Sequence, residues 1–76
     1  MKEYVEVVAK FDLDGRILPM LVKIEDDKFE VDRIMDIRPA ASLKSGGAGI
    51  RYTCSIMGRQ SYLFLEENKW FIEQIQ

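Results

Sequence analysis

Apolar residues recur at every second position in short segments, and this alternation most constrains how the chain can fold. It is clearest in "EYVEVVAKF", where Val5, Val7, Ala9 and Phe11 share one parity, and it returns in "IRYTCSIM". A period of two buries one face of a β-strand, whereas an amphipathic helix repeats every three to four residues. The alternation therefore predicts an all-β protein.

Tight turn signals separate six such segments, except at one long connection. "DLDG", "EDDK", "GRQ" and "ENK" are the turn signals, and the glycine in the first supplies the positive φ that a tight turn requires. Consecutive hairpins favour an antiparallel meander, and six strands with an apolar face usually close into a small barrel. We therefore predict one domain over residues 1–76, a six-stranded antiparallel meander closing into an SH3-like barrel. An OB-like barrel with a short helix near residues 31–44 is the alternative.

The segment "KFEVDRIMDIR" breaks the alternation in its middle. Met35 continues the parity of Val31, but Ile34 does not. A bulge or bend near Arg33 would reconcile these positions with a strand, because a bulge inserts one extra residue. The same three apolar residues also fit one helical turn. The sequence therefore leaves strand, bulge and helical turn open for residues 31–37.

The long connection, "RPAASLKSGGAG", lies in the basic part of a chain whose formal net charge is −2. Residues 33–59 carry five basic residues and one acid. The Walker A spacing is absent, and the third glycine of a dinucleotide fingerprint is missing, so neither phosphate motif is present. Glycine backbone can still form a nest of N–H groups that binds an anion. A connection between strands that binds nothing is the favoured interpretation.

Basic and polar residues around this connection define a candidate ligand- or anion-binding surface. The candidate residues are Arg38, Ser42, Lys44, Gly46, Gly47, Gly49, Arg51 and Arg59. A solvated sheet face with scattered carboxylates is the favoured alternative. Nucleic-acid binding by such a surface would be weak and would fall steeply with salt. No aromatic-rich single-strand-binding motif accompanies these residues.

Aromatic residues gather in the C-terminal half of the chain. Tyr52 and Trp70 share parity with apolar neighbours, so we expect both in the core, and Cys54 has the same inward parity as Tyr52. Phe64 and Phe71 are the candidates for exposure, although core or partial core is the favoured interpretation for the aromatic residues as a set. Exposed aromatic rings would suit a dimer or peptide interface.

No constellation in the sequence indicates catalysis. The chain contains no histidine, so no imidazole can activate Cys54. The paired aspartates fall in predicted hairpin turns, where aspartate is favoured for turn geometry alone, and no EF-hand spacing is present. The sequence therefore predicts a protein that is not an enzyme and that has no metal site and no cofactor.

The sequence predicts a cytoplasmic protein. Charges interrupt the N-terminal segment "MKEYVEVVAKFD", so it lacks the apolar region of a signal peptide. No apolar run has the length needed to span a bilayer, so no membrane partner is expected. A single cysteine cannot form an intrachain disulfide, which agrees with a reducing compartment.

The segments "FDLDGRILP", "FEVDRIMDIRPAASLKSGGAGIRYTC" and "YLFLEENKWFIE" resemble, in this order, a family of small uncharacterised bacterial β-barrel proteins. Those proteins have about 70–80 residues, so the resemblance covers nearly the whole chain. The resemblance implies a small β-barrel in a bacterial cytoplasm and no activity. The "DG.I.P" opening and the closing aromatic strand are also similar to small β domains encoded beside error-prone DNA polymerases. That likeness implies a DNA-related function, although this chain lacks their central tryptophans.

These observations combine into one functional hypothesis and one alternative. We predict a small cytoplasmic β-barrel binding module whose partner is another protein or a second copy of the chain. The alternative is weak binding of nucleic acid or another polyanion by the basic surface around residues 38–52.

Overall fold

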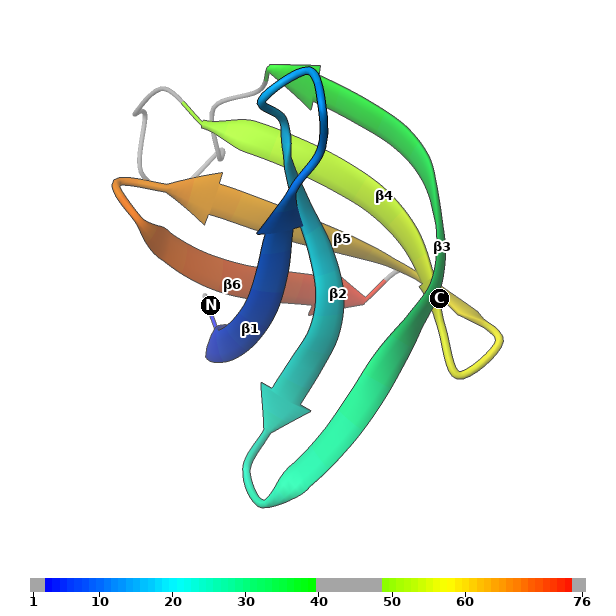
Figure 1. Cartoon of the computed structure of the whole chain (residues 1–76). Helices are drawn as coiled ribbons and strands as arrows, with labels where there is room; N and C mark the ends of the chain where they lie inside the picture. The colour runs from blue at the N-terminus through cyan, green and yellow to red at the C-terminus, as the bar shows by residue number, and fades with distance from the viewer. Residues whose placement is uncertain (1–2, 40–48, 75–76) are drawn as a thin grey trace.

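Six antiparallel strands make up the part of the chain that the computed structural model describes, residues 3–39 and 49–74. The strands are β1 (Glu3–Phe11), β2 (Ile17–Ile24), β3 (Asp27–Pro39), β4 (Ile50–Ile56), β5 (Arg59–Glu66) and β6 (Lys69–Gln74). Each pairs with the next strand in the chain, and β1 also pairs with β6, so the sheet closes into a barrel (Figure 1). The predicted all-β, six-stranded meander barrel is therefore confirmed.

The long strand β3 bends at two register shifts against β4. One shift lies between Val31 and Arg33, and the other between Ile34 and Asp36. Of the alternatives that the sequence left open for this segment, a strand with a bulge near Arg33 is observed, and the helical turn does not form. Residues 31–39 are strand rather than the helix of the OB-like alternative, and the remainder of that predicted helix lies outside the described residues.

Residues with positive φ close the tight turns. Gly15 has a φ of 81° and Gly58 a φ of 72°, in the β1–β2 and β4–β5 connections respectively. In the first connection, Asp12 Oδ1 accepts hydrogen bonds from the backbone N–H groups of Asp14 and Arg16, at 2.9 and 2.8 Å. These bonds replace ladder hydrogen bonds where the strands separate.

The core fills the barrel interior mainly from β4, β5 and β6. Its buried members are Val22, Tyr52, Cys54, Ile56, Leu63 and Ile72. Trp70 is half-buried against this cluster, and its ring centroid lies 5.4 Å from that of Tyr52. The predicted inward positions of Tyr52, Cys54 and Trp70 are therefore confirmed.

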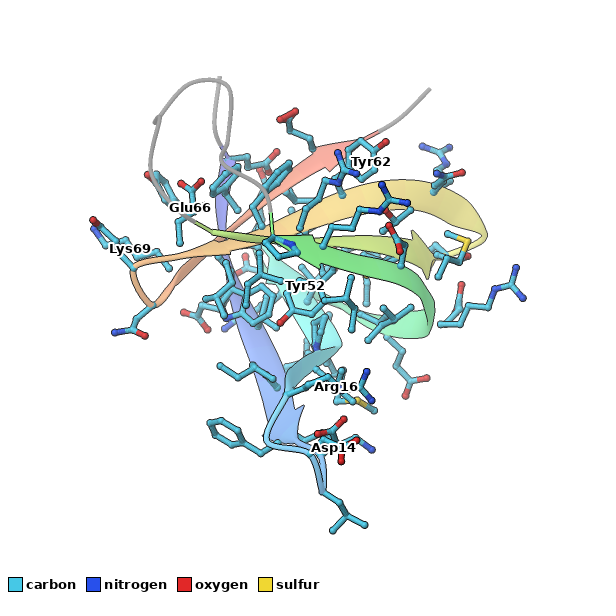
Figure 2. All side chains as sticks on the ribbon, turned by 90° about the horizontal axis from the view of Figure 1, so that it is seen from above. Asp14, Arg16, Tyr52, Tyr62, Glu66 and Lys69 are labelled. Carbon is cyan, nitrogen blue, oxygen red and sulfur yellow. The ribbon has the colours of Figure 1, made fainter. Side chains whose placement is uncertain are left out.

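The ladders differ in length around the barrel. The β3–β4 and β4–β5 ladders each contain seven register pairs and the β5–β6 ladder six. The β1–β6 and β2–β3 ladders contain only three and four. Residues 6–11 of β1 therefore pair with β2 alone, and residues 17–20 of β2 pair with β1 alone. We call residues 6–20 the arm and strands β3–β6 the body; Figure 2 shows the arm projecting from the barrel, with Asp14 and Arg16 near its tip.

Candidate functional site

An outward-facing row of side chains crosses five strands of the barrel. In lateral order from β3 to β1, its members are Arg38, Arg51, Phe64, Phe71 and Tyr4. Each member directly opposes the next in the ladder register, so all five share one face of the sheet. They alternate along their strands with inward-facing core residues, so they point away from the interior. We call these five residues the outer row.

Two arginines occupy the β3–β4 end of the outer row. Arg38 is exposed, and its Nε donates a hydrogen bond of 2.7 Å to Asp36 Oδ2. Arg51 is half-buried, and its guanidinium carbon lies 4.8 Å from the ring centroid of Tyr62. The Nε of Arg51 is buried and has no hydrogen-bond partner among the described residues. Among the described residues, therefore, Arg38 has a paired carboxylate and Arg51 has only the face of an aromatic ring.

Stacked aromatic rings form the middle of the outer row. The centroids of Phe64 and Phe71 are 4.7 Å apart and their planes differ by 5°. Tyr62 meets Phe64 edge-on at 6.2 Å, and Tyr4 meets Phe71 edge-on at 6.0 Å. Figure 2 shows Tyr62 on the opposite side of the sheet from the core residue Tyr52.

The exposure considered for Phe64 and Phe71 is not observed, and the burial that the favoured interpretation expects for these aromatic residues is. They are only 6% and 1% exposed, although both point away from the barrel interior. Rings on adjacent strands stack face to face and two tyrosines flank them, which removes ring surface from water. These two rings therefore offer no open surface to a dimer or peptide partner.

The structure separates Arg59 from the other two arginines. Arg59 opposes Ile56 in register, five positions along β4 from Arg51, or about 17 Å at ~3.3 Å per residue. It lines a pocket of about 300 Å³ at the barrel end, with apolar side chains that include Phe29 and Ile72. Arg59 therefore does not belong to the same surface as Arg38 and Arg51.

The other predicted site residues belong to the Gly-rich connection between β3 and β4. Ser42, Lys44, Gly46 and Gly47 lie outside the described residues. Gly49 is half-buried directly before β4. Of the predicted binding residues, the structure thus brings together Arg38 and Arg51, and whether they bind a ligand stays a prediction.

Tyr62 is a companion of Arg51 that the sequence pattern did not single out. The two-residue turn at Met57 and Gly58 fixes the β4–β5 register, because each step up β4 is matched by a step along β5. That register places Arg51 opposite Phe64 and diagonal to Tyr62, within reach of a long side chain. The turn signal "GRQ" covers residues 58–60 rather than Met57 and Gly58, so it did not predict the register that forms this pair.

The described residues show no constellation for covalent or metal chemistry. Among them, no group of three or more cysteines, aspartates or glutamates could hold a metal ion. Cys54 is buried, and burial raises the pKa of its thiol to about 11, so the nucleophilic thiolate is scarce near neutral pH. The same part of the chain has no helix with the length and apolar character that crossing a membrane requires.

Comparison with known proteins finds similarity to a ribosomal protein. The chain is 34% identical over 67 residues to the small ribosomal subunit protein uS3 of Rickettsia akari (strain Hartford). The aligned part covers 87% of this chain and 30% of that protein, so the chain spans less than a third of its relative. No family model and no solved structure matches the chain. Membership of the family of small uncharacterised bacterial β-barrel proteins is not contradicted and stays a prediction.

Proposed function

We propose that this chain is a small, non-catalytic β-barrel module that binds single-stranded nucleic acid through Arg38, Arg51 and Tyr62. The observation that carries the proposal is the half-buried guanidinium of Arg51, which stacks on Tyr62 and directly opposes Arg38. Stacked arginine and tyrosine are the side chains on which unpaired bases pack, and arginine also binds phosphate.

The difference between the two arginines makes Arg51 the principal contact. A phosphate that approaches Arg38 competes with Asp36, whose carboxylate already accepts a hydrogen bond from its Nε. Arg51 has no paired carboxylate among the described residues, so an anion there adds a countercharge instead of replacing one. We therefore expect substitution of Arg51 to weaken binding more than substitution of Arg38.

Single-stranded ligands suit this surface better than duplexes. The net charge of the chain is −2, and the site contains two arginines, too few to follow the backbone of a duplex. Two phosphate contacts on a single strand would give a slope of about −1.4 in log affinity against log salt. The name of the relative places it in the small ribosomal subunit, which favours RNA as the ligand.

Anisotropy titrations of labelled single-stranded RNA, single-stranded DNA and duplex, each over a salt series, test the proposal. We expect Arg51→Gln to lower the affinity for single strands about tenfold, and Tyr62→Leu by a similar factor through lost stacking. Arg59→Gln is the matched control, because it removes the same charge from the start of β5, opposite the far end of β4.

Two results would overturn nucleic-acid binding at this surface. One is the absence of binding to every oligonucleotide at low salt. The other is an equal loss of affinity in Arg51→Gln and Arg59→Gln, because equal losses would report net charge and not this site.

Protein binding, including self-association, is the second candidate function. The buried rings of Phe64 and Phe71 give it no support. The open edge of the arm does, because an unpaired strand edge can accept another strand. A cytoplasmic location accords with either function, since Cys54 is a buried, free thiol.

A further inference from the structure

The edge of β1 that faces β6 is open beyond the closing ladder. That ladder ends at Val5 and Trp70, because β6 begins at Lys69. From Glu6 to Phe11, the backbone groups on this side meet no strand among the described residues. An unpaired row of N–H and C=O groups is a template for another strand.

Exposed apolar side chains and a groove accompany this open edge. Val8 is 62% exposed and Phe11 is 74% exposed, both on the strand whose edge is open. Beside the edge, a groove of about 650 Å³ is lined by β1 residues and by Lys69 and Trp70. The edge thus combines free backbone hydrogen-bonding groups with apolar surface that a partner could cover.

We propose that a second copy of this chain pairs with the open edge, antiparallel, about a two-fold axis at Val8. This pairing places Glu6 of each copy opposite Lys10 of the other, with the two Val8 side chains between them. On the other face, Val7 lies opposite Ala9 of the second copy. The pattern "EVVAK" is therefore complementary to itself in charge and in apolar character.

Charge complementarity selects this register over its neighbours. In an antiparallel pair of identical strands, opposed side chains must lie on the same face of the sheet. The two-fold axis must therefore pass through a residue, and each alternative register moves the axis by one residue. An axis at Ala9 places Glu6 opposite Asp12 of the second copy, and an axis at Lys10 places the two Lys10 side chains opposite each other. Both shifted registers oppose like charges, which destabilises a strand pair.

The groove limits the pairing at one end and receives a side chain there. The second copy's β1 follows the line of β6 along the edge, so continuous pairing stops where Trp70 already pairs with Val5. Phe11 of the second copy comes next in line, on the face that carries Val5 and Val7. Its exposed ring would enter the groove beside Trp70.

The pairing is short, so the dimer should be weak. It covers residues 6–10 of each copy and one phenylalanine ring, which is less surface than a standard protein interface. We therefore expect a dissociation constant on the order of micromolar or weaker. The charges decide whether such a weak dimer forms, because each Glu6–Lys10 contact occurs twice about the axis.

Charge reversal on the two sides of the axis tests the proposal. Glu6→Lys alone places two cations opposite each other at each contact, and Lys10→Glu alone places two anions there. Each variant should weaken self-association about tenfold, as measured by sedimentation equilibrium of the 8.8 kDa chain. An equal mixture of the two variants should restore it, because every contact in the mixed dimer pairs opposite charges.

The mixture distinguishes this pairing from a general effect of net charge on association. Asp26→Lys is the control for Glu6→Lys, since it makes the same change in net charge in the β2–β3 turn, and this variant should self-associate as the wild-type chain does. A wild-type chain that stays monomeric up to roughly 1 mM would overturn the proposal and leave the edge to a strand of another protein. So would a dimer that persists in both single variants, or a mixture that remains monomeric. Failure of oligonucleotide binding would not affect any of these results.

Discussion

The body and the arm of this barrel differ in strand pairing and in side-chain burial. Ladders of six or seven pairs join the strands of the body, and its residues Tyr52, Leu63 and Phe71 are almost completely buried. Residues 6–11 and 17–20 of the arm pair only within the β1–β2 hairpin, and the apolar residue Leu13 of the arm is fully exposed. The same alternation of apolar residues therefore buries most of the core in the body and leaves Val8 and Phe11 on the surface of the arm.

Buried side chains of the body and exposed side chains of the arm contribute differently to folding and to binding. A buried side chain stabilises the fold in proportion to the apolar area that it removes from water. An exposed one contributes little to folding and remains available to a partner. Substitutions in the body should therefore change the free energy of unfolding, whereas substitutions in the arm should change local opening and association.

Truncation of Leu63 should give the largest effect. Leu63 is fully buried between Tyr52 and Ile72 in the ladder register. Leu63→Ala should lower the free energy of unfolding by about 3 kcal/mol, in urea denaturation followed by Trp70 fluorescence. Leu13→Ala, at the arm tip, is the matched control and should change it by less than ~0.5 kcal/mol. Equal losses in the two variants would break the distinction between body and arm.

The Tyr52 hydroxyl should give the next largest effect, because it joins the two regions. It donates a hydrogen bond to the backbone carbonyl oxygen of Ile17, the first residue of β2, in the arm. Tyr52→Phe leaves that part-buried carbonyl without this donor and should cost about 1–2 kcal/mol in the same denaturation experiment. Tyr4→Phe, which removes a hydroxyl from an exposed ring, should cost nothing measurable. An unchanged stability in Tyr52→Phe would mean that the arm is not held by this bond.

Alkaline pH should destabilise the body through Cys54. Burial raises the pKa of its thiol from 9.0 to about 11, so the folded state disfavours the thiolate that the unfolded chain forms. The stabilisation is complete below pH 9 and is lost as the pH rises from about 9 to about 11. Burial also raises the pKa of Tyr52, which acts in the same direction. Cys54→Ala should flatten the decline in unfolding free energy across this range, and an unaltered decline would contradict the assignment.

The smallest effect should come from Asp12 and should stay within the arm. Hydrogen bonds from Arg16 and Asp14 lower the pKa of this carboxyl below 3.8, so its contribution is present above that pH and is lost as acid protonates it. Asp12→Asn should speed amide hydrogen exchange in the arm and leave the body unchanged. Asp14→Asn is the control, because the Asp14 carboxylate makes only a 4.0 Å contact with Arg16. Faster exchange throughout the body would show that the two regions open together.

Local signals in the sequence were sufficient to predict the strands and the residues that face the barrel interior. Alternation placed Tyr52 and Cys54 in the core, whereas the broken parity at Ile34 left a bulge and a helical turn open for the segment that forms β3. Parity also shows that Phe64 and Phe71 point away from the barrel interior. It does not show whether other side chains cover that outward face. Their burial depends on how rings from adjacent strands pack, which no single segment encodes.

The candidate site was harder to predict than the fold because it depends on register. The β4–β5 turn lies at Met57 and Gly58 rather than in "GRQ", so the expected turn would have set another register and missed the diagonal contact of Arg51 with Tyr62. The β3–β4 connection is long and β3 contains two register shifts, so the length of the connection did not predict that Arg38 opposes Arg51. The β1–β6 closure joins opposite ends of the chain and has no local signal.

The meander order has a consequence for how quickly the chain folds. Five of its six ladders join consecutive strands, and only the closing ladder joins residues as distant as Val5 and Trp70. Hairpins form within microseconds, and the entropy of closing a loop rises by only about 0.6 kcal/mol for each doubling of its length. The barrel can therefore grow by successive hairpins and close last, along its shortest ladder. Such a route keeps most contacts local, so refolding should be faster than in barrels of this size whose strands cross over.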